Sequence, residues 1–380
     1  MFFKFFKKIF IMIILIINIF IKNDGTNYLK LKIEIHDIKK YYNLNYKGIL
    51  INKKNFSKID NPKVSIISSV YNRENYILRF LRSIQNQFFD DIEIIFIDDF
   101  SKDNSVKMIE KYQDEDERII LIKNKKNKGT LISRNIGALK AKGEFLMFPD
   151  SDDILSQNIL SLCYKTAKIY NYEMIRFNIY SEKYFIFSMI PNNLTSVVYQ
   201  PELRTYLLHG FGYEALVDGI ISNKFIQKIA FLTTLNDINN YYLNQKMIYF
   251  EDGLINFALH LKVKSLYLLK NIGYYYFFNA DGVSRSVNRN LYLKNYFLYL
   301  KFLEENTKNI QIEKEMIFFL LNLYIYDNNL LKNITDDFQL YDDIFNLLLN
   351  NKFITPINKK KINNLQKIIQ NIKDNKNKNK

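Results

Sequence analysis

Residues 145–153 read FLMFPDSDD, an apolar run followed at once by three carboxylates, Asp150, Asp152 and Asp153. The run is typical of a buried strand, so we expect the acidic residues at its carboxyl end. Clustered carboxylates repel one another unless they share a cation. Hard divalent cations take oxygen ligands of this kind, often together with substrate phosphates. The stretch therefore indicates a metal-held phosphate ligand; a solvated turn with an Asp helix cap is the alternative.

The sequence before this stretch alternates between strand and helix patterns. Apolar runs predict buried strands over 64–70, 92–97, 119–122 and 144–148, and periodic or capped segments predict helices over 74–87, 103–112 and 130–141. Such alternation is typical of a Rossmann-like α/β fold with a doubly wound, mostly parallel sheet.

Polar side chains follow three of these strands. They are Ser69, Tyr71, Asn72 and Arg73 after the first strand, Asp98, Asp99 and Ser101 after the second, and the acidic residues after the fourth. Ligands of doubly wound sheets bind at the carboxyl ends of strands, so this coincidence favours one binding site at that edge.

The composition restricts the possible partners. The chain has 380 residues and a formal net charge of +15. Its lysines are spread through Asn- and Ile-rich sequence and are densest over 359–380. Because no nucleic-acid-binding motif accompanies them, we expect no nucleic-acid partner. The single cysteine, Cys163, excludes an intrachain disulfide, and three separated histidines offer no zinc site.

The N-terminus carries an apolar run over 9–21, preceded by Lys4, Lys7 and Lys8. This pattern is typical of a signal anchor or signal peptide over 1–22. No small-residue cleavage site follows, which favours an uncleaved membrane anchor. The basic flank then predicts a single-pass protein with a luminal body, in the Golgi or the endoplasmic reticulum. Secretion or luminal release after signal cleavage is the alternative.

We divide the rest of the chain at Asn61-Pro62, which is typical of a boundary. Residues 23–61 are interpreted as a stem, 62–290 as the main domain, and 291–380 as a helical C-terminal extension with a basic tail. Beyond residue 155 the pattern becomes mixed, with aromatic-rich strands such as 272–278.

Four motifs within residues 62–155 carry a resemblance to a known family. They are Pro62–Ile67 with Tyr71-Asn72, Ile97–Ser101, Asn127–Gly129 with Ser133–Gly137, and Asp150–Asp153. In this order they resemble the family 2 glycosyltransferases of the GT-A fold. A weaker resemblance continues through Ser222–Lys224, Phe250–Asp252, and Tyr274–Tyr276 with Ser284.

The resemblance implies a metal-dependent enzyme of the hexosyl- or N-acetylhexosaminyltransferase type. Its donor would be a nucleotide-sugar, usually a UDP-sugar, and its acceptor a hydroxyl group on a glycan, protein or lipid. Residues 62–155 would then bind the nucleotide-sugar, and residues 156–290 would form the acceptor half.

The resemblance also implies roles for the residues of the nucleotide-sugar-binding half. Asp99 would hold the uracil edge with Ser69 beside it, and Asp98 would support that loop. Tyr71 and Asn72 would complete the donor site.

The same comparison assigns the metal, Mn²⁺ or Mg²⁺ on the donor diphosphate, to the carboxylates of Asp150, Asp152 and Asp153. Arg134 would face them, orienting an Asp or approaching a phosphate; a surface salt bridge is the alternative.

Glycosyl transfer also needs a general base for the acceptor hydroxyl. Asp252 is our candidate, with Glu251 as its neighbour or as an acceptor ligand; a helix N-cap is the structural alternative for Asp252. An in-line displacement with one general base and no nucleophile from the enzyme predicts inversion at the anomeric carbon.

Two positions depart from the family pattern, Phe100 in place of the usual Gly and Pro149 before the acidic cluster, and neither removes a chemical group. A nucleotidyltransferase would need a Gly-rich phosphate loop, and residues 64–75 contain no Gly. A membrane-anchored relic that binds nucleotide-sugar without turnover is the remaining alternative.

Overall fold

The computed structural model describes residues 56–181, 185–186, 197–199, 219–223, 259, 263–277 and 295, and single helical residues between 339 and 374. The expected anchor and nearly all of the stem lie outside these residues. Within the described part of the chain, no helix is long and apolar enough to cross a membrane. The residues described between 339 and 374 are helical.

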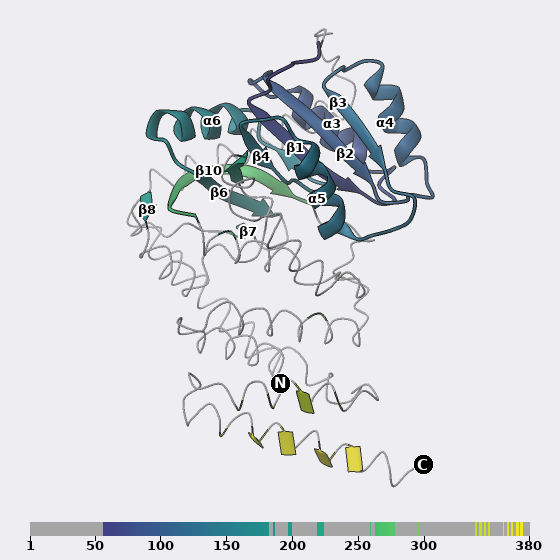
Figure 1. Cartoon of the computed structure of the whole chain (residues 1–380), viewed down its shortest axis with the longest axis vertical. Helices are drawn as coiled ribbons and strands as arrows, with labels where there is room; N and C mark the ends of the chain where they lie inside the picture. The colour runs from purple at the N-terminus through teal and green to yellow at the C-terminus, as the bar shows by residue number, and fades with distance from the viewer. Residues whose placement is uncertain are drawn as a thin grey trace. The chain divides into compact units, whose positions relative to one another are not determined.

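A mixed sheet organises the described residues (Figure 1). Its first four strands are β1 (Val64–Val70), β2 (Ile92–Asp98), β3 (Ile119–Lys123) and β4 (Phe145–Met147). They are parallel and lie in the order β3-β2-β1-β4. The chain moves outward from β1 to β3 and then crosses to the other side of β1. The loops after β1, β2 and β4 therefore meet at a topological switch point, where ligands of such sheets bind.

The second half of the sheet departs from the sequence expectation. It contains β5 (Ile154–Leu155), β6 (Met174–Ser181), β7 (Phe185–Ile186), β8 (Val197–Tyr199), β9 (Gly219–Ser222) and β10 (Ser265–Tyr276). Only the β6–β10 pair is parallel among these strands; β9 pairs antiparallel with both β4 and β6. The prediction of a mostly parallel sheet is confirmed for the first four strands, whereas the second half of the sheet is mixed. Several strands here have only two or three residues, too few to display a periodic pattern.

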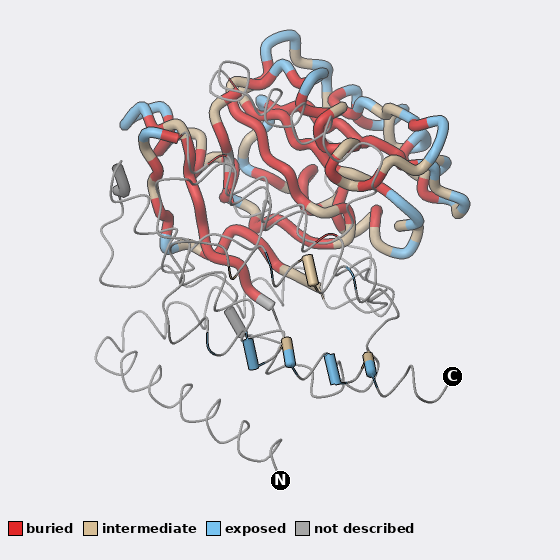
Figure 2. The backbone as a smooth tube through the Cα atoms, turned by 60° about the horizontal axis from the view of Figure 1, so that its bottom comes forward, coloured by how far each residue is buried: buried red, intermediate tan, exposed pale blue. Residues whose placement is uncertain are grey.

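Helices cover both faces of the parallel strands. They are α3 (Ile77–Gln85), α4 (Ser105–Gln113), α5 (Thr130–Lys140) and α6 (Ile159–Tyr170). Helix α3 buries its apolar side chains in the same cluster as Val64 and Ile66 of β1. Helix α5 packs on the other face, where Gly137 lies so close to Ile67 and Ile97 that a Cβ would clash. Figure 2 shows the buried strands surrounded by exposed loops.

The compact unit begins at Phe56, earlier than the expected domain start at residue 62. Phe56 forms an isolated parallel bridge with Asp116, and its ring centroid lies 3.9 Å from the guanidinium carbon of Arg118. Residues 56–61 therefore begin within the compact unit, although the boundary expected at Asn61-Pro62 placed them in the stem.

Candidate active site

The acidic loop, Asp150–Asp153, follows β4 at the switch point. One carboxylate oxygen from each of its three aspartates lies within 4.8 Å of the other two. The Asp150 side chain is 39% exposed, that of Asp152 is 16% exposed, and Asp153 is buried behind them. The Ser151 hydroxyl donates to the Ser69 carbonyl at 2.9 Å, which ties the loop to the end of β1.

Strand β10 fixes the innermost carboxylate. The Tyr274 hydroxyl donates to Asp153 Oδ2 at 2.7 Å and accepts the Asp150 N–H at 3.0 Å. The Phe277 N–H donates to Asp153 Oδ1 at 2.8 Å. Burial, and then the charges of Asp152 and Asp150, raise the pKa of Asp153 well above its ordinary value. Burial and the Asp153 carboxylate raise the pKa of Tyr274, so its hydroxyl keeps the proton that it donates.

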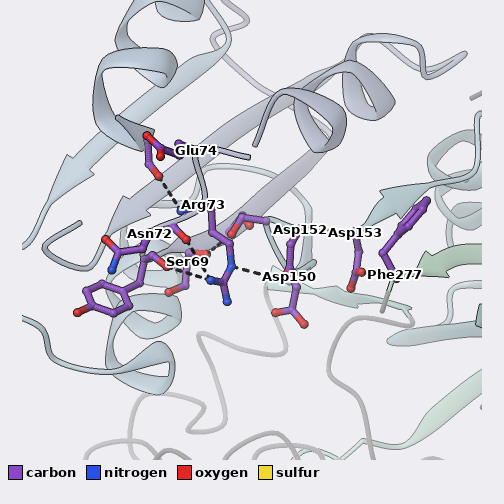
Figure 3. Close-up of polar contacts among 12 residues, drawn as sticks. Ser69, Asn72, Arg73, Glu74, Asp150, Asp152, Asp153 and Phe277 are labelled. Carbon is purple, nitrogen blue, oxygen red and sulfur yellow. Dashed lines mark hydrogen bonds and ion pairs between the residues drawn. The ribbon is translucent and has the colours of Figure 1, made fainter. Parts of the chain in front are cut away.

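Three arginines from different elements surround the acidic loop. Arg134 of α5, itself buried, pairs with Asp150 at 2.7 Å. Arg73 of the β1 loop pairs with Asp152, its Nε 3.3 Å from Oδ2 (Figure 3). Arg79 of α3 donates to the Asp152 main-chain carbonyl. The loop therefore presents its carboxylates in a setting where protein cations balance part of their charge.

The chemistry of this loop fits a divalent cation. Three carboxylate oxygens this close match the hard oxygen ligands that Mg²⁺ and Mn²⁺ prefer. Asp150 and Asp152 are the more exposed ligands, whereas both Asp153 oxygens already accept hydrogen bonds from the protein. Asp153 therefore also anchors the loop, a role that the sequence did not suggest.

The loop after β2 presents a second acidic pair. Asp99 Oδ1 accepts hydrogen bonds from Asn124 Nδ2 at 3.0 Å and the Lys128 N–H at 2.7 Å. Its Oδ2 accepts the Gly129 N–H at 2.7 Å. Gly129 has φ 91°, a conformation that favours glycine. Asp99 is buried and joins the β2 loop to the start of α5, and Oδ2 keeps capacity for a further donor.

Asp98 supports this loop, as expected. Its carboxylate accepts the N–H groups of Phe100 and Ser101 at 3.2 Å. Phe100, which replaces the family's usual Gly, has φ 73°. Left-handed backbone costs a non-glycine residue roughly 1–2 kcal/mol. The Lys102 ammonium lies 3.3 Å from the centroid of the Phe100 ring, a cation–π contact on the exposed side of the loop.

The loops after β1 and β2 are joined through their polar side chains. The Asn72 N–H donates to Ser101 Oγ at 3.0 Å, and the Lys102 N–H donates to Asn72 Oδ1 at 2.8 Å. The Glu74 N–H likewise donates to Asp103 Oδ2 at 2.9 Å. The Asn72 side chain, expected at the donor site, is thus committed to holding the two loops together.

Residues 65–232 match the family model described as glycosyl transferase family 2. The chain carries a family 2 glycosyltransferase domain.

Curated relatives carry glycosyltransferase names, and solved structures share the fold. EpsH of Bacillus subtilis is 27% identical over 266 residues, which cover 69% of this chain and 75% of EpsH. The cholesterol galactosyltransferase of Borreliella burgdorferi is 28% identical over 263 residues, which cover 67% of this chain and 69% of that protein. Residues 1–349 of S. aureus TarS in complex with UDP match with a TM-score of 0.60 and 17% identity, covering 84% of this chain and 92% of TarS 1–349. At this identity the structural match shows a shared fold.

The glycosyltransferase domain brings most of the expected site residues to one edge. Ser69 is the last residue but one of β1, and Tyr71 and Asn72 follow that strand. Asp98 ends β2 and Asp99 follows it, and Arg134 pairs with Asp150 of the acidic loop. The general base candidates Asp252 and Glu251 lie outside the described residues.

Sequence reasoning assigned no role to three residues that contact the acidic loop. Arg73 had only its position after the first strand as a signal, and Arg79 lay within the predicted helix over 74–87. Tyr274 was one of several tyrosines in its strand. Nothing in the sequence distinguishes Tyr274 from its neighbours.

Proposed function

We propose that the chain is a metal-dependent, inverting glycosyltransferase that transfers a sugar from a UDP-sugar to a hydroxyl acceptor. The observation that carries the proposal is the acidic loop, whose three carboxylates lie within 4.8 Å of one another at the switch point. The acidic loop follows β4 on one side of β1, and Asp99 follows β2 on the other side. A nucleotide diphosphate can span such an edge, with its base at one loop and its phosphates at the other.

In the proposed reaction, each of the site's side chains has a separate role. Asp150 and Asp152, backed by Asp153, would hold Mn²⁺ or Mg²⁺, which supplies Lewis acidity to the diphosphate oxygens when bound. Asp99 would accept a hydrogen bond from the base through its remaining capacity, while Asp98 keeps the loop in place. Arg134 orients Asp150. Because these groups are fixed before the donor arrives, little reorganisation accompanies the loss of the diphosphate.

The relatives support the donor class. TarS 1–349 forms complexes with UDP and with UDP-GlcNAc, and the Borreliella relative is a galactosyltransferase. These facts favour a UDP-hexose or a UDP-N-acetylhexosamine as the donor. The acceptor remains a hydroxyl on a glycan, protein or lipid, which the acceptor half would select.

The proton of the acceptor hydroxyl requires a base. We assign this role to Asp252, with Glu251 beside it, from the sequence alone. A single positioned carboxylate is worth typically about 10²–10⁴-fold in rate. Direct attack by the acceptor on the donor inverts the anomeric carbon, so an NMR assay that finds retained configuration would exclude the assignment.

Membrane attachment through residues 1–22 also belongs to the proposal, supported by the lysine-flanked apolar run. The relatives named above are bacterial, so they lend no support to a Golgi location.

The test is UDP release from a panel of UDP-sugars with Mn²⁺ or Mg²⁺ and then with EDTA. We expect turnover of one donor, lost in EDTA, and a loss of about 10²-fold or more in Asp152→Asn. Asp114→Asn, an exposed carboxylate at the end of α4, is the matched control and should retain full activity. Undiminished turnover in EDTA or in Asp152→Asn would refute the metal role. UDP binding without any turnover would instead favour the relic.

A further inference from the structure

Arg73 occupies a position between the two halves of the proposed donor site. The β1 loop that carries it lies between the loops after β2 and β4, because β1 lies between those strands. Its Nε pairs with Asp152 Oδ2 at 3.3 Å, and its Nη1 donates to the carbonyls of Tyr71 at 3.1 Å and Asn72 at 3.2 Å (Figure 3). Its Nη2 has no partner among the described residues. The guanidinium therefore lies at the acidic loop with one nitrogen still available.

The backbone of Arg73 is held much more firmly than its side chain. The Arg73 N–H donates to Ser105 Oγ at 2.7 Å, and its carbonyl accepts the N–H groups of Tyr76 and Ile77, each at 2.9 Å. The side chain is 20% exposed, and among the described residues its polar partners are the carbonyls of Tyr71 and Asn72 and the Asp152 carboxylate. A change of rotamer could move the guanidinium without disturbing the loop.

The ion pair and a divalent cation would use the same carboxylate. A cation bound by Asp152 would lie close to the Arg73 guanidinium, and the two positive charges would repel each other. The diphosphate of a nucleotide brings new negative charge to the same place. A guanidinium binds phosphate oxygens in a bidentate manner, so it has a better partner there than the carboxylate that it loses.

We infer that Arg73 exchanges partners, balancing Asp152 in the donor-free protein and turning to the donor diphosphate when cation and nucleotide bind. The exchange would keep the acidic loop from holding a cation tightly before the donor arrives. This inference rests on the proposed function, since it presumes a diphosphate ligand at the acidic loop. Arg134 is not equivalent, because its side chain is buried under the loop.

The experiment measures two affinities of the full-length chain by calorimetry, that for Mn²⁺ without nucleotide and that for UDP at saturating Mn²⁺. In Arg73→Gln we expect Mn²⁺ to bind about three- to tenfold tighter, because a competing charge is gone. We expect UDP to bind about 10- to 100-fold weaker, because a charged hydrogen-bond donor to phosphate is gone. Opposite shifts are diagnostic, since mere damage to the loop would weaken both. Arg73→Lys, which keeps the charge, should restore the Mn²⁺ affinity of the wild type and part of the UDP affinity.

Lys102→Gln removes the same charge from the neighbouring exposed loop and serves as the control; it should leave both affinities within about twofold of wild type. Unchanged or weaker Mn²⁺ binding in Arg73→Gln, unchanged UDP binding, or equal shifts in the control would each overturn the exchange. A wild-type chain that binds neither Mn²⁺ nor UDP would overturn the proposed function as well. Wild-type binding that Arg73→Gln leaves unaltered would overturn this inference alone.

Discussion

The hydroxyl of Tyr274 gives the sharpest test of how the acidic loop is held. Tyr274→Phe removes one oxygen, which bridges Asp153 Oδ2 at 2.7 Å and the Asp150 N–H at 3.0 Å. The ring remains, so no cavity opens, and the change isolates the two hydrogen bonds. Because Tyr274 and Asp153 are both buried, water cannot easily replace the bond that the carboxylate loses.

The expected cost follows from these contacts. A hydrogen bond to a charged group contributes about 1.5–3 kcal/mol to stability, and the Asp150 N–H adds less because its loop reaches solvent. We therefore expect Tyr274→Phe to lower the free energy of unfolding by about 2–3 kcal/mol. Partners that orient metal ligands also affect metal binding, so Mn²⁺ affinity should fall by about 10- to 100-fold.

Urea denaturation measures the first quantity, with the midpoint expected to fall while the m-value stays constant. Tyr267→Phe is the matched control on β10, because the Tyr267 hydroxyl has no hydrogen-bond partner among the described residues. Its stability should remain within about 0.5 kcal/mol of wild type. If Tyr274→Phe matched this control in stability and in Mn²⁺ affinity, the bridging role of the hydroxyl would be refuted.

Three further changes probe the scaffold around the site. Asp116→Ala leaves the buried Arg118 guanidinium without its 2.9 Å partner and should cost about 3–5 kcal/mol in urea denaturation; a loss below 1 kcal/mol would contradict the pairing. Gly143→Ala places a Cβ 2.5 Å from the Ser65 backbone nitrogen, so it should lower the free energy of unfolding by about 1–3 kcal/mol and reduce the melting temperature. An unchanged melting temperature would mean that the turn relaxes freely. Burial raises the pKa of Glu144, but hydrogen bonds from two lysines outweigh it and hold that pKa below its ordinary value. The stability that the Glu144 carboxylate contributes is therefore present above its pKa in the unfolded chain and is lost as the pH falls through its pKa in the folded protein. In acid titrations, Glu144→Gln should therefore lose less stability than the wild type below about pH 4. Identical acid profiles would show that Glu144 does not contribute to the pH dependence of stability.

The parallel half of the fold could be predicted because its signals are local. The strands β1 and β2 are mainly apolar and are buried along almost their whole length, and helix α3 between them keeps a buried face at the helical period. The position of the acidic loop follows from the same pattern, since residues after a buried strand must emerge at its carboxyl end. The antiparallel strands were not predictable in this way. Strands β5 and β7 have two residues each, and β9 pairs on both sides with segments distant in sequence.

The sequence by itself determined that Asp99 and the acidic loop would lie at one edge of an α/β sheet, because apolar runs mark the strand ends and the carboxyl ends of parallel strands share one edge. It also identified the family through motifs that include Asn72 and Arg134. Only the tertiary structure decided which side chains balance the carboxylates. Tyr274 lies 124 residues from Asp150 along the chain, and the arginines come from a loop and two helices, so their distances to the acidic loop depend on how those elements pack. Side-chain pairing across elements is set by packing geometry, which a pattern of polar and apolar residues does not encode.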